Sequence, residues 1–180
     1  MLFRTATADR LRPSTDPRSV RFPRGVGLLA AAIGVLTILS AGTALAQTGP
    51  PPPTSPELGK ANELMALPAA AFVTADKTSP GRPFNLRTDG CSGPINPAYF
   101  KDACIQHDFA YRNYGKSDGG LGLALTEAAR SYADERFRVE LNRSCEAWAI
   151  PATTAEDCLN QAALAYTAVR SEGSNAFFGR

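Results

Sequence analysis

Four cysteines constrain this 180-residue chain more than any other feature of its sequence. Cys91 and Cys104 are separated by twelve residues, and so are Cys145 and Cys158. An even number of cysteines in a small exported chain is typical of a disulfide framework, and four cysteines allow three connectivities. Because both gaps are local loops, the spacing favours the pairs Cys91–Cys104 and Cys145–Cys158. A zinc site with four cysteine ligands is the alternative, but the sequence contains no C-x2-C pair.

The first 46 residues have the pattern of a cleaved export signal. Arginines precede an uncharged apolar run over 26–39, and Ala44-Leu45-Ala46 provides the small-residue pattern of a cleavage site. We therefore predict a signal peptide over 1–46, cleavage after Ala46 and secretion of the remainder. An uncleaved membrane anchor is the alternative, because the apolar run together with its neighbouring Ala and Gly residues could almost span a bilayer.

The net charge of the chain depends on this leader. Six of the 19 Lys and Arg residues precede residue 25, where only Asp9 and Asp16 offset them, so residues 47–180 keep 13 basic and 15 acidic residues. A net charge of about −2 leaves no electrostatic footprint for nucleic acid, and we expect no nucleic-acid partner. The single histidine, His107, excludes sites that need two, such as the HExxH zinc site.

The rest of the chain predicts a linker followed by one helical domain. The Pro-rich stretch 47–56 is expected to be an extended linker, and 57–180 to be the folded domain. Apolar periodicity predicts helices at about 56–67, 97–114, 120–142 and 154–172, with a turn or short helix at 69–75. No segment shows the alternation of a strand. The expected fold is all-α: a small helical bundle with two long central helices and two disulfides.

The lone histidine lies on the inward face of the helix predicted at 97–114, and Tyr111 shares that face. A buried histidine is more often a core residue than a catalyst, so its partner decides its role. On the next helix, Asp134 and Glu127 could each offer a carboxylate to one imidazole nitrogen. Such a contact fixes the tautomer and leaves the other nitrogen free to take a proton from water. The residues alone leave the choice between the two carboxylates open.

A candidate metal site adjoins this histidine. If Cys91 is bonded to Cys104, the loop that contains Asp89 and Gly90 is tied to the helix one turn before Asp108. The two carboxylates can then converge with loop carbonyls into an oxygen-rich site, which suits calcium. Gly90 lets the backbone turn so that its carbonyl faces the ion. Alternatively, Asp89-Gly90 is only a turn and Asp108 only a solvated side chain.

At these residues the chain resembles the secreted phospholipase A2 family of bacteria and fungi. The similarity lies in Thr88-Asp89-Gly90-Cys91-Ser92, in Ala103-Cys104-x-x-His107-Asp108-Phe109-x-Tyr111-Arg112-Asn113-Tyr114 and in Asp134-x-x-Phe137. It covers most of the chain beyond the predicted linker. Four features depart from the family's pattern: the stretch between the first two cysteines is short, Asn96 stands where aspartate is common, Ala110 replaces a glycine, and the segment 115–130 is more extended than in the family's bacterial members.

The resemblance implies a secreted, calcium-dependent phospholipase A2 that hydrolyses the sn-2 ester of glycerophospholipids to a lysophospholipid and a fatty acid. It also implies that 57–180 is the catalytic domain and that the two local disulfides stabilise it. The implied site consists of His107 as general base, Asp134 as its orienting carboxylate, Tyr111 beside them, and Ca²⁺ held by Asp89, Asp108 and the Gly90 carbonyl. The implied partner is phospholipid at a membrane or micelle surface, with no stable protein partner, so we expect a monomer.

Two other classes of function fit part of the sequence. One is a catalytically silent, phospholipase-like secreted module that binds lipid or protein. The other is a small disulfide-stapled structural protein, in which the pairing of His107 with Asp134 would be accidental. Calcium-dependent release of fatty acid would separate these classes. Apolar residues such as Phe84, Phe100 and Trp148 could line an acyl channel or belong to the core, and the sequence does not decide between the two.

Overall fold

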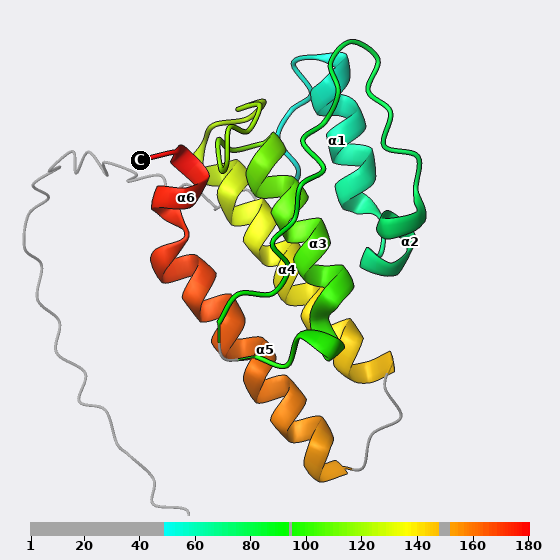
Figure 1. Ribbon diagram of the computed structural model, residues 1–180, viewed down its shortest axis with the longest axis vertical. Coiled ribbons are helices and arrows are strands. Elements are labelled where there is room, and N and C mark those ends of the chain that lie inside the picture. Colours follow the sequence, from blue (N-terminus) through cyan, green and yellow to red (C-terminus); the bar gives the residue numbers. More distant parts are fainter. Residues whose placement is uncertain (1–48, 94, 148–151) are drawn as a thin grey trace, which may run out of the picture. The chain divides into compact units, whose positions relative to one another are not determined.

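The computed structural model describes residues 49–93, 95–147 and 152–180. The predicted signal peptide, the first residues of the predicted linker and Trp148 lie outside the described residues. Within the described part, the chain forms helices and no strand: α1 (Pro56–Ala66), α2 (Ala69–Thr74), α3 (Pro97–Asn113), α4 (Glu127–Ala147), α5 (Ala152–Glu172) and α6 (Ser174–Phe178) (Figure 1). The predicted all-α fold is confirmed, although α6 was not expected. None of these helices is long and apolar enough to cross a membrane.

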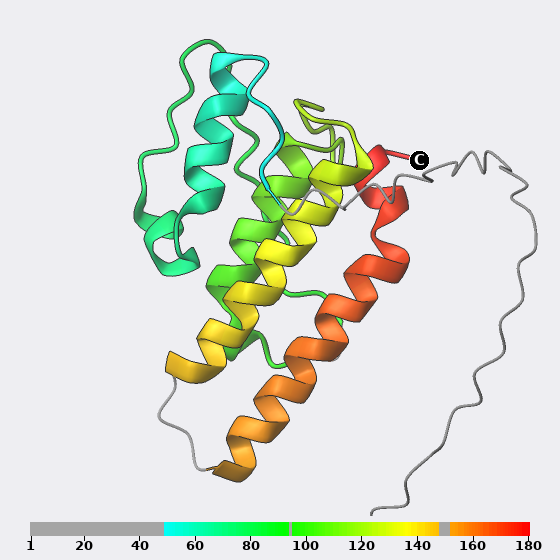
Figure 2. The ribbon, with the colours of Figure 1, turned by 180° about the vertical axis from the view of Figure 1, so that it is seen from behind.

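The long helices α3, α4 and α5 pack side by side, each antiparallel to the next (Figure 1). Two opposite views show that α1 and α5 flank the α3/α4 pair on opposite sides (Figures 1 and 2). The α3/α4 interface buries Phe100 and Ala103 against Phe137 and Leu141, and α5 adds Ala162 to the same cluster. This core therefore lies beside the residues predicted to form the site.

Local sequence sets where α1 and α3 begin. The Ser55 side chain accepts a hydrogen bond from the Leu58 amide, and the Asn96 side chain accepts one from the Ala98 amide, both at 3.1 Å. A proline follows each of these caps. The cap satisfies an amide that has no partner within the helix, and proline at the first position loses no hydrogen bond. Asn96 therefore starts the helix that carries His107.

The prediction of a helix from residue 120 is wrong, because α4 begins at Glu127. Residues 114–126 form a loop whose amides donate to the last carbonyls of α3, as Leu121 does to Arg112 at 2.8 Å. A Cβ at Gly120 would lie 2.3 Å from that carbonyl oxygen. Glycine allows this close approach, and the loop satisfies helix-end carbonyls that would otherwise lack partners.

Both predicted disulfides form. Cys91–Cys104 joins the loop before α3 to that helix, with 5.3 Å between the Cα atoms, and Cys145–Cys158 joins α4 to α5, with 5.8 Å. All four cysteines of the chain are paired in this way. No thiolate is therefore left for the zinc alternative.

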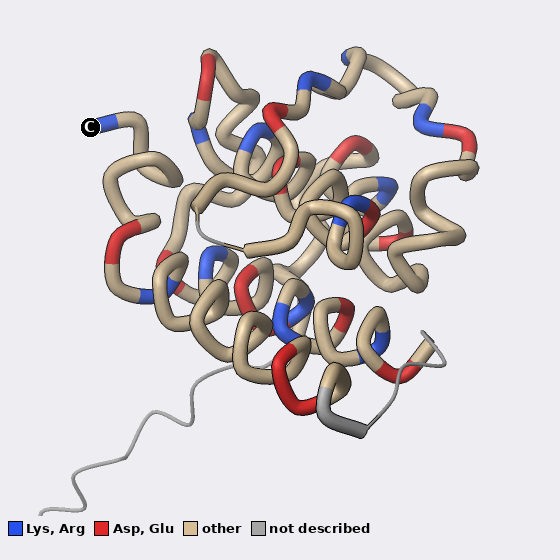
Figure 3. Tube along the Cα trace, turned by 60° about the horizontal axis from the view of Figure 1, so that its bottom comes forward, with Lys and Arg blue, Asp and Glu red and all other residues tan. Residues whose placement is uncertain are grey.

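Basic and acidic residues are interspersed along the described chain (Figure 3).

One buried carboxylate, Glu140, fixes α2 against α4. Glu140 is almost fully buried, accepts a hydrogen bond from the Ala69 amide at 2.9 Å and pairs with Arg136 at 2.7 Å. This contact anchors the α1–α2 segment on one side of α4.

The described part of the predicted linker is extended but not free of the domain. Residues 50–54 form neither helix nor strand, as expected. Pro51 is nevertheless buried, and its carbonyl oxygen accepts a hydrogen bond from Asn62 Nδ2 at 2.7 Å. Pro51 therefore packs against the helix α1 that follows the linker.

Candidate active site

His107 and Asp134 meet at the interface of α3 and α4. His107 Nε2 lies 3.0 Å from Asp134 Oδ1. The Asp134 side chain is fully buried and that of His107 nearly so. Because Nε2 faces the carboxylate, Nδ1 is the nitrogen left for proton transfer. The structure thus brings together the pair that the family resemblance implied.

Glu127, the rival carboxylate, does not reach the histidine. Its oxygens accept hydrogen bonds from Arg130 Nε at 2.8 Å and from Arg170 Nη2 at 3.0 Å. These guanidinium groups, Arg130 above all, hold the pKa of Glu127 below its usual value. Of the two candidates, Asp134 is therefore the partner of His107.

Two aromatic side chains confine the imidazole. The Phe137 ring stacks on it with centroids 4.4 Å apart, and the Tyr111 ring lies tilted at 4.3 Å. The Tyr111 hydroxyl also donates to Asp134 Oδ1 at 2.8 Å. Burial, together with the negative charge of Asp134, raises the pKa of Tyr111, so the hydroxyl keeps its proton. Tyr111 therefore contacts both members of the pair.

A cavity of about 340 Å³ opens beside His107. Its apolar lining comes from the Cys91–Cys104 disulfide and from Ile95, Phe137, Leu164, Ala165, Ala168 and Val169. Phe84 and Phe100, which the sequence left undecided between an acyl channel and the core, are buried in the core. A cavity of this volume can hold a small ligand or part of a larger one, and its apolar walls favour an apolar ligand.

Asp89 and Asp108 converge as predicted, but they converge on an arginine. Arg112 Nη2 lies 2.6 Å from Asp89 Oδ1, and Nη1 lies 3.3 Å from Asp108 Oδ1. Asp118 accepts from the same Nη2 at 2.7 Å. Arg112 is only 3% exposed, so it is a buried cation among three carboxylates. Its hydrogen bond to Asp89 is the main reason why the pKa of that carboxyl is lowered.

The loop before α3 is built around Asp108. Oδ2 of this residue accepts hydrogen bonds from Thr88 Oγ1 at 2.5 Å, from the Gly90 amide at 3.1 Å and from the Asp89 amide at 3.2 Å. Gly90 has a φ of +74°, a left-handed conformation that glycine adopts without strain. The loop and the helix are therefore joined by these bonds as well as by the neighbouring disulfide.

The donor chemistry of this loop fits calcium. Asp89 and Asp108 offer oxygen ligands, the kind that calcium prefers. Both carboxylates are paired with Arg112 in this structure. Among residues 49–93, 95–147 and 152–180, no group of three or more His, Cys, Asp or Glu is arranged to hold a metal ion. A calcium ion would thus compete with Arg112 for Asp89 and Asp108.

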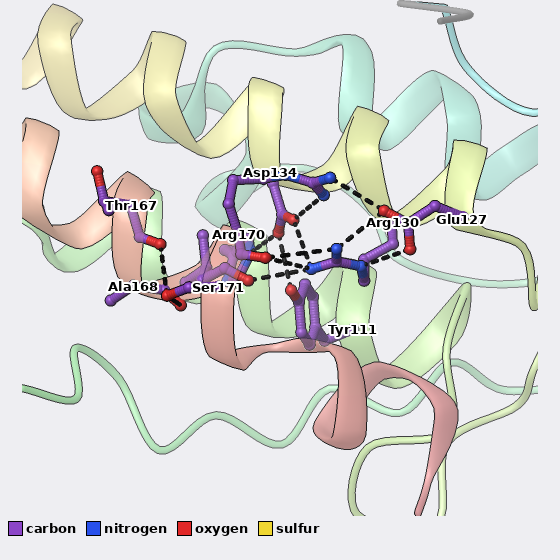
Figure 4. A network of polar contacts seen from close by, with 10 residues as sticks. Tyr111, Glu127, Arg130, Asp134, Thr167, Ala168, Arg170 and Ser171 are labelled. Carbon is purple, nitrogen blue, oxygen red and sulfur yellow. Dashed lines mark hydrogen bonds and ion pairs between the residues drawn. The ribbon is translucent and has the colours of Figure 1, made fainter.

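Two arginines that the sequence reasoning missed complete the surroundings of Asp134. Arg170 Nη1 donates to Asp134 Oδ2 at 2.7 Å, and Arg130 Nη1 lies 3.4 Å from the same oxygen (Figure 4). Arg130 is four residues before Asp134 on α4, and this spacing could have indicated the pair. Arg170 belongs to α5, 36 residues beyond Asp134, and no local pattern indicates that contact.

The end of α5 approaches Tyr111 closely. A Cβ at Gly173 would lie 2.4 Å from the Tyr111 hydroxyl oxygen and 2.5 Å from the Val169 carbonyl oxygen. Phe177 of α6 meets the Tyr111 ring edge-on, with centroids 5.2 Å apart. Glycine is therefore required where α5 passes into α6, and this junction confines Tyr111.

The structure therefore places a His–Asp pair, carried by two helices, beside an apolar cavity and a loop with acidic residues. A pair of this kind can carry out acid–base chemistry. The family model described as prokaryotic phospholipase A2 matches residues 61–173. The chain belongs to this family, and its function is accordingly of the phospholipase A2 type, with lipid as substrate. The matched range includes every candidate site residue named above. No curated protein matches the chain.

Proposed function

We propose that this protein is a secreted, calcium-dependent phospholipase A2 that hydrolyses the sn-2 ester of glycerophospholipids to a lysophospholipid and a free fatty acid. The observation that carries the proposal is the 3.0 Å contact between His107 and Asp134 at the wall of an apolar cavity. Family membership supports the class of reaction. The pair supplies a base next to a space in which an acyl chain fits.

In this proposal His107 is the general base. Nδ1 takes a proton from a water molecule that attacks the ester carbonyl carbon. Asp134 stabilises the resulting imidazolium by accepting the hydrogen bond from Nε2, and Tyr111 steadies the same carboxylate oxygen. His107 then gives the proton to the leaving alkoxide. Because water attacks directly, no covalent intermediate and no serine nucleophile are required.

Asp89 and Asp108, with the Gly90 carbonyl, are the proposed holders of calcium. When bound, calcium supplies a Lewis acid that stabilises negative charge on the ester oxygen. The disulfide that ties the loop to the helix of His107 supports this assignment, because it holds Asp89 close to Asp108.

The apolar cavity is the proposed site of the sn-2 acyl chain. Burying an alkyl chain against apolar walls is favourable by about 0.8 kcal/mol for each methylene group. His107 and Asp108 are the ionisable residues of its lining, so they define the polar end at which the ester would lie. The walls contributed by α5 would then face the alkyl part of the chain.

Export is part of the proposal. Residues 1–46 would be removed after Ala46, and the rest would act outside the cell as a monomer on a membrane or micelle surface. The two disulfides support this location, because such bonds persist in oxidising compartments.

A second candidate function is a catalytically silent module of the same fold that binds lipid or protein. Arg112 is the observation that favours it, because a buried cation already pairs with both proposed calcium ligands. In such a module, Asp89 and Asp108 would only stabilise the loop.

One assay separates the two candidates. The protein is incubated with phosphatidylcholine that carries different acyl chains at sn-1 and sn-2, with and without a calcium chelator. We expect release of the sn-2 acid alone, loss of release with the chelator, and none from a folded His107→Asn variant. Release of both acids, or of none, contradicts the proposed activity. Release that survives the chelator contradicts its calcium dependence.

A further inference from the structure

Asp134 is held from two sides. Oδ1 faces His107. Figure 4 shows the other partners: Tyr111 at Oδ1, and Arg170 and Arg130 at Oδ2. The side chain is 0% exposed, so no water competes for these contacts. When both oxygens of a carboxylate have directional, charge-assisted partners, its plane is fixed. The arginines therefore help to set which oxygen the histidine meets.

The charges around Asp134 balance one another. Arg130 and Arg170 both pair with Asp134, and both also pair with Glu127, at 2.8 and 3.0 Å respectively. Two guanidinium groups and two carboxylates form one compact cluster. A carboxylate buried without such partners would be costly, because it loses its hydration without compensation. The cluster thus allows Asp134 to lie in the core.

The same arginines connect Asp134 to the helix that walls the cavity. Arg170 belongs to α5, and Arg130 Nη1 donates to the Val169 carbonyl oxygen at 3.1 Å. Val169 lines the cavity. At the far end of the α4/α5 pair, Cys145–Cys158 provides a covalent link. The contacts that orient Asp134 are therefore also the contacts that seat α5.

We infer that Arg170 and Arg130 are positioning residues, which clamp Oδ2 of Asp134 and thereby make the His107–Asp134 pair depend on the seating of α5. Within the described residues, neither arginine lines the cavity, so both act through Asp134 and not on the lipid. The expected effect of the two arginines on turnover rests on the proposed function. Their effect on the orientation of Asp134 does not depend on that function.

Arg170→Met is the decisive variant. It removes the guanidinium but keeps an unbranched chain, at a side chain that is 29% exposed, whereas Arg130 is too deeply buried for a clean substitution. Arg170→Lys keeps the charge and tests rescue. Arg138→Met is the matched control: Arg138 also spans α4 and α5, pairing with Glu135 and lying 6.0 Å from the Tyr166 ring centroid.

The first readout is steady-state kinetics on phosphatidylcholine. In Arg170→Met we expect kcat to fall roughly 10-fold to 100-fold, because a misplaced carboxylate weakens the base. KM should stay within about twofold, because Arg170 does not line the cavity, and Arg130 and the Cys145–Cys158 disulfide still hold α5 against α4. Arg170→Lys should recover part of kcat, and Arg138→Met should resemble the wild type. A wild-type kcat in Arg170→Met, or an increase in KM alone, overturns the inference.

The second readout needs no turnover. His107 is the only histidine of the chain, so protein labelled with ¹⁵N-histidine gives a single imidazole spectrum. The proton on Nε2, which is hydrogen-bonded to Asp134, should give the same signal in the wild type and in Arg138→Met. In Arg170→Met that signal should shift or broaden. A folded Arg170→Met protein with the wild-type spectrum overturns the inference. Lack of turnover in the wild type would overturn only the proposed function.

Discussion

Arg112 Nη2 lies 2.6 Å from Asp89 Oδ1, so the carboxylate expected to bind calcium is already paired with a buried cation. Asp118 contacts the same nitrogen at 2.7 Å. Two aspartates thus share one partner, but only Asp89 lies in the loop proposed to hold the metal. This relationship provides a matched pair of substitutions.

Asp89→Asn is expected to weaken calcium binding by at least about tenfold, because the site loses a charged oxygen ligand. Asp118→Asn is the control, since it removes the charge of the other aspartate that contacts Arg112 Nη2 but no proposed ligand. Isothermal titration calorimetry with calcium measures both. Equal losses in the two variants would mean that Asp89 affects the metal only through Arg112.

His107→Asn is expected to keep the fold and the calcium affinity but to lose turnover by roughly 10²–10⁴-fold, the usual contribution of a general base. Asp134→Asn should lose less, because the imidazole remains. Circular dichroism checks the fold, and fatty-acid release measures activity. A folded His107→Asn protein that works at the wild-type rate would make His107 a core residue.

Glu127 is expected to make stability sensitive to acid. Its pKa is lowered in the folded protein by Arg130 and Arg170. A lowered carboxyl pKa contributes stability above the unfolded value, about 4.3, and this contribution is lost as the pH falls through the folded pKa. The melting temperature of the wild type should therefore fall more steeply below pH 4 or so than that of Glu127→Gln. Parallel curves would contradict this.

Ala168→Phe is expected to narrow the cavity from the side of α5. Hydrolysis of phospholipids with long sn-2 chains should then fall about tenfold relative to short ones, because the added ring occupies space that the distal methylenes need. Ala163→Phe, on the same helix but outside the lining, is the control. Comparing kcat/KM on long-chain and short-chain lipids measures the effect. A uniform loss on all chain lengths would argue that Ala168 does not face the chain.

The two disulfides are expected to differ in what they support. Each spans a sequence separation of 13 residues, and its removal by a double Cys→Ser change should cost about 3 kcal/mol of unfolding free energy. Loss of Cys91–Cys104 should also weaken calcium binding, because it frees the Asp89 loop. Loss of Cys145–Cys158 should not. Urea unfolding and calorimetry test this, and equal effects on calcium would reject the tether.

Much of the fold follows from local signals in the sequence. Ser55-Pro56 and Asn96-Pro97 begin α1 and α3, and cysteine spacing predicts the disulfides, because these features act over a few residues. The start of α4 could not be read in this way. Residues 120–126 were expected to form the first turns of that helix, but amides in this segment instead donate to carbonyls at the end of α3. This contact between two separate segments has no local signal in the sequence.

The candidate site shows the same division. His107, Asp108 and Asp89 were identified from a motif in which each residue type suits its chemistry. The burial of Arg112 and the contact of Arg170 with Asp134 were not expected. Both depend on how loops and helices far apart in the chain pack together. Periodicity within one helix carries no information about such contacts.

Gly173 has a consequence for how this chain can vary. Any side chain there would collide with the Tyr111 hydroxyl, which itself donates to Asp134. In a saturation-mutagenesis library selected for activity, position 173 should therefore accept glycine alone. It would then be as intolerant of substitution as a catalytic residue, although glycine has no functional group. The reason is that the Tyr111 hydroxyl, which donates to Asp134, occupies the space that a side chain at residue 173 would need.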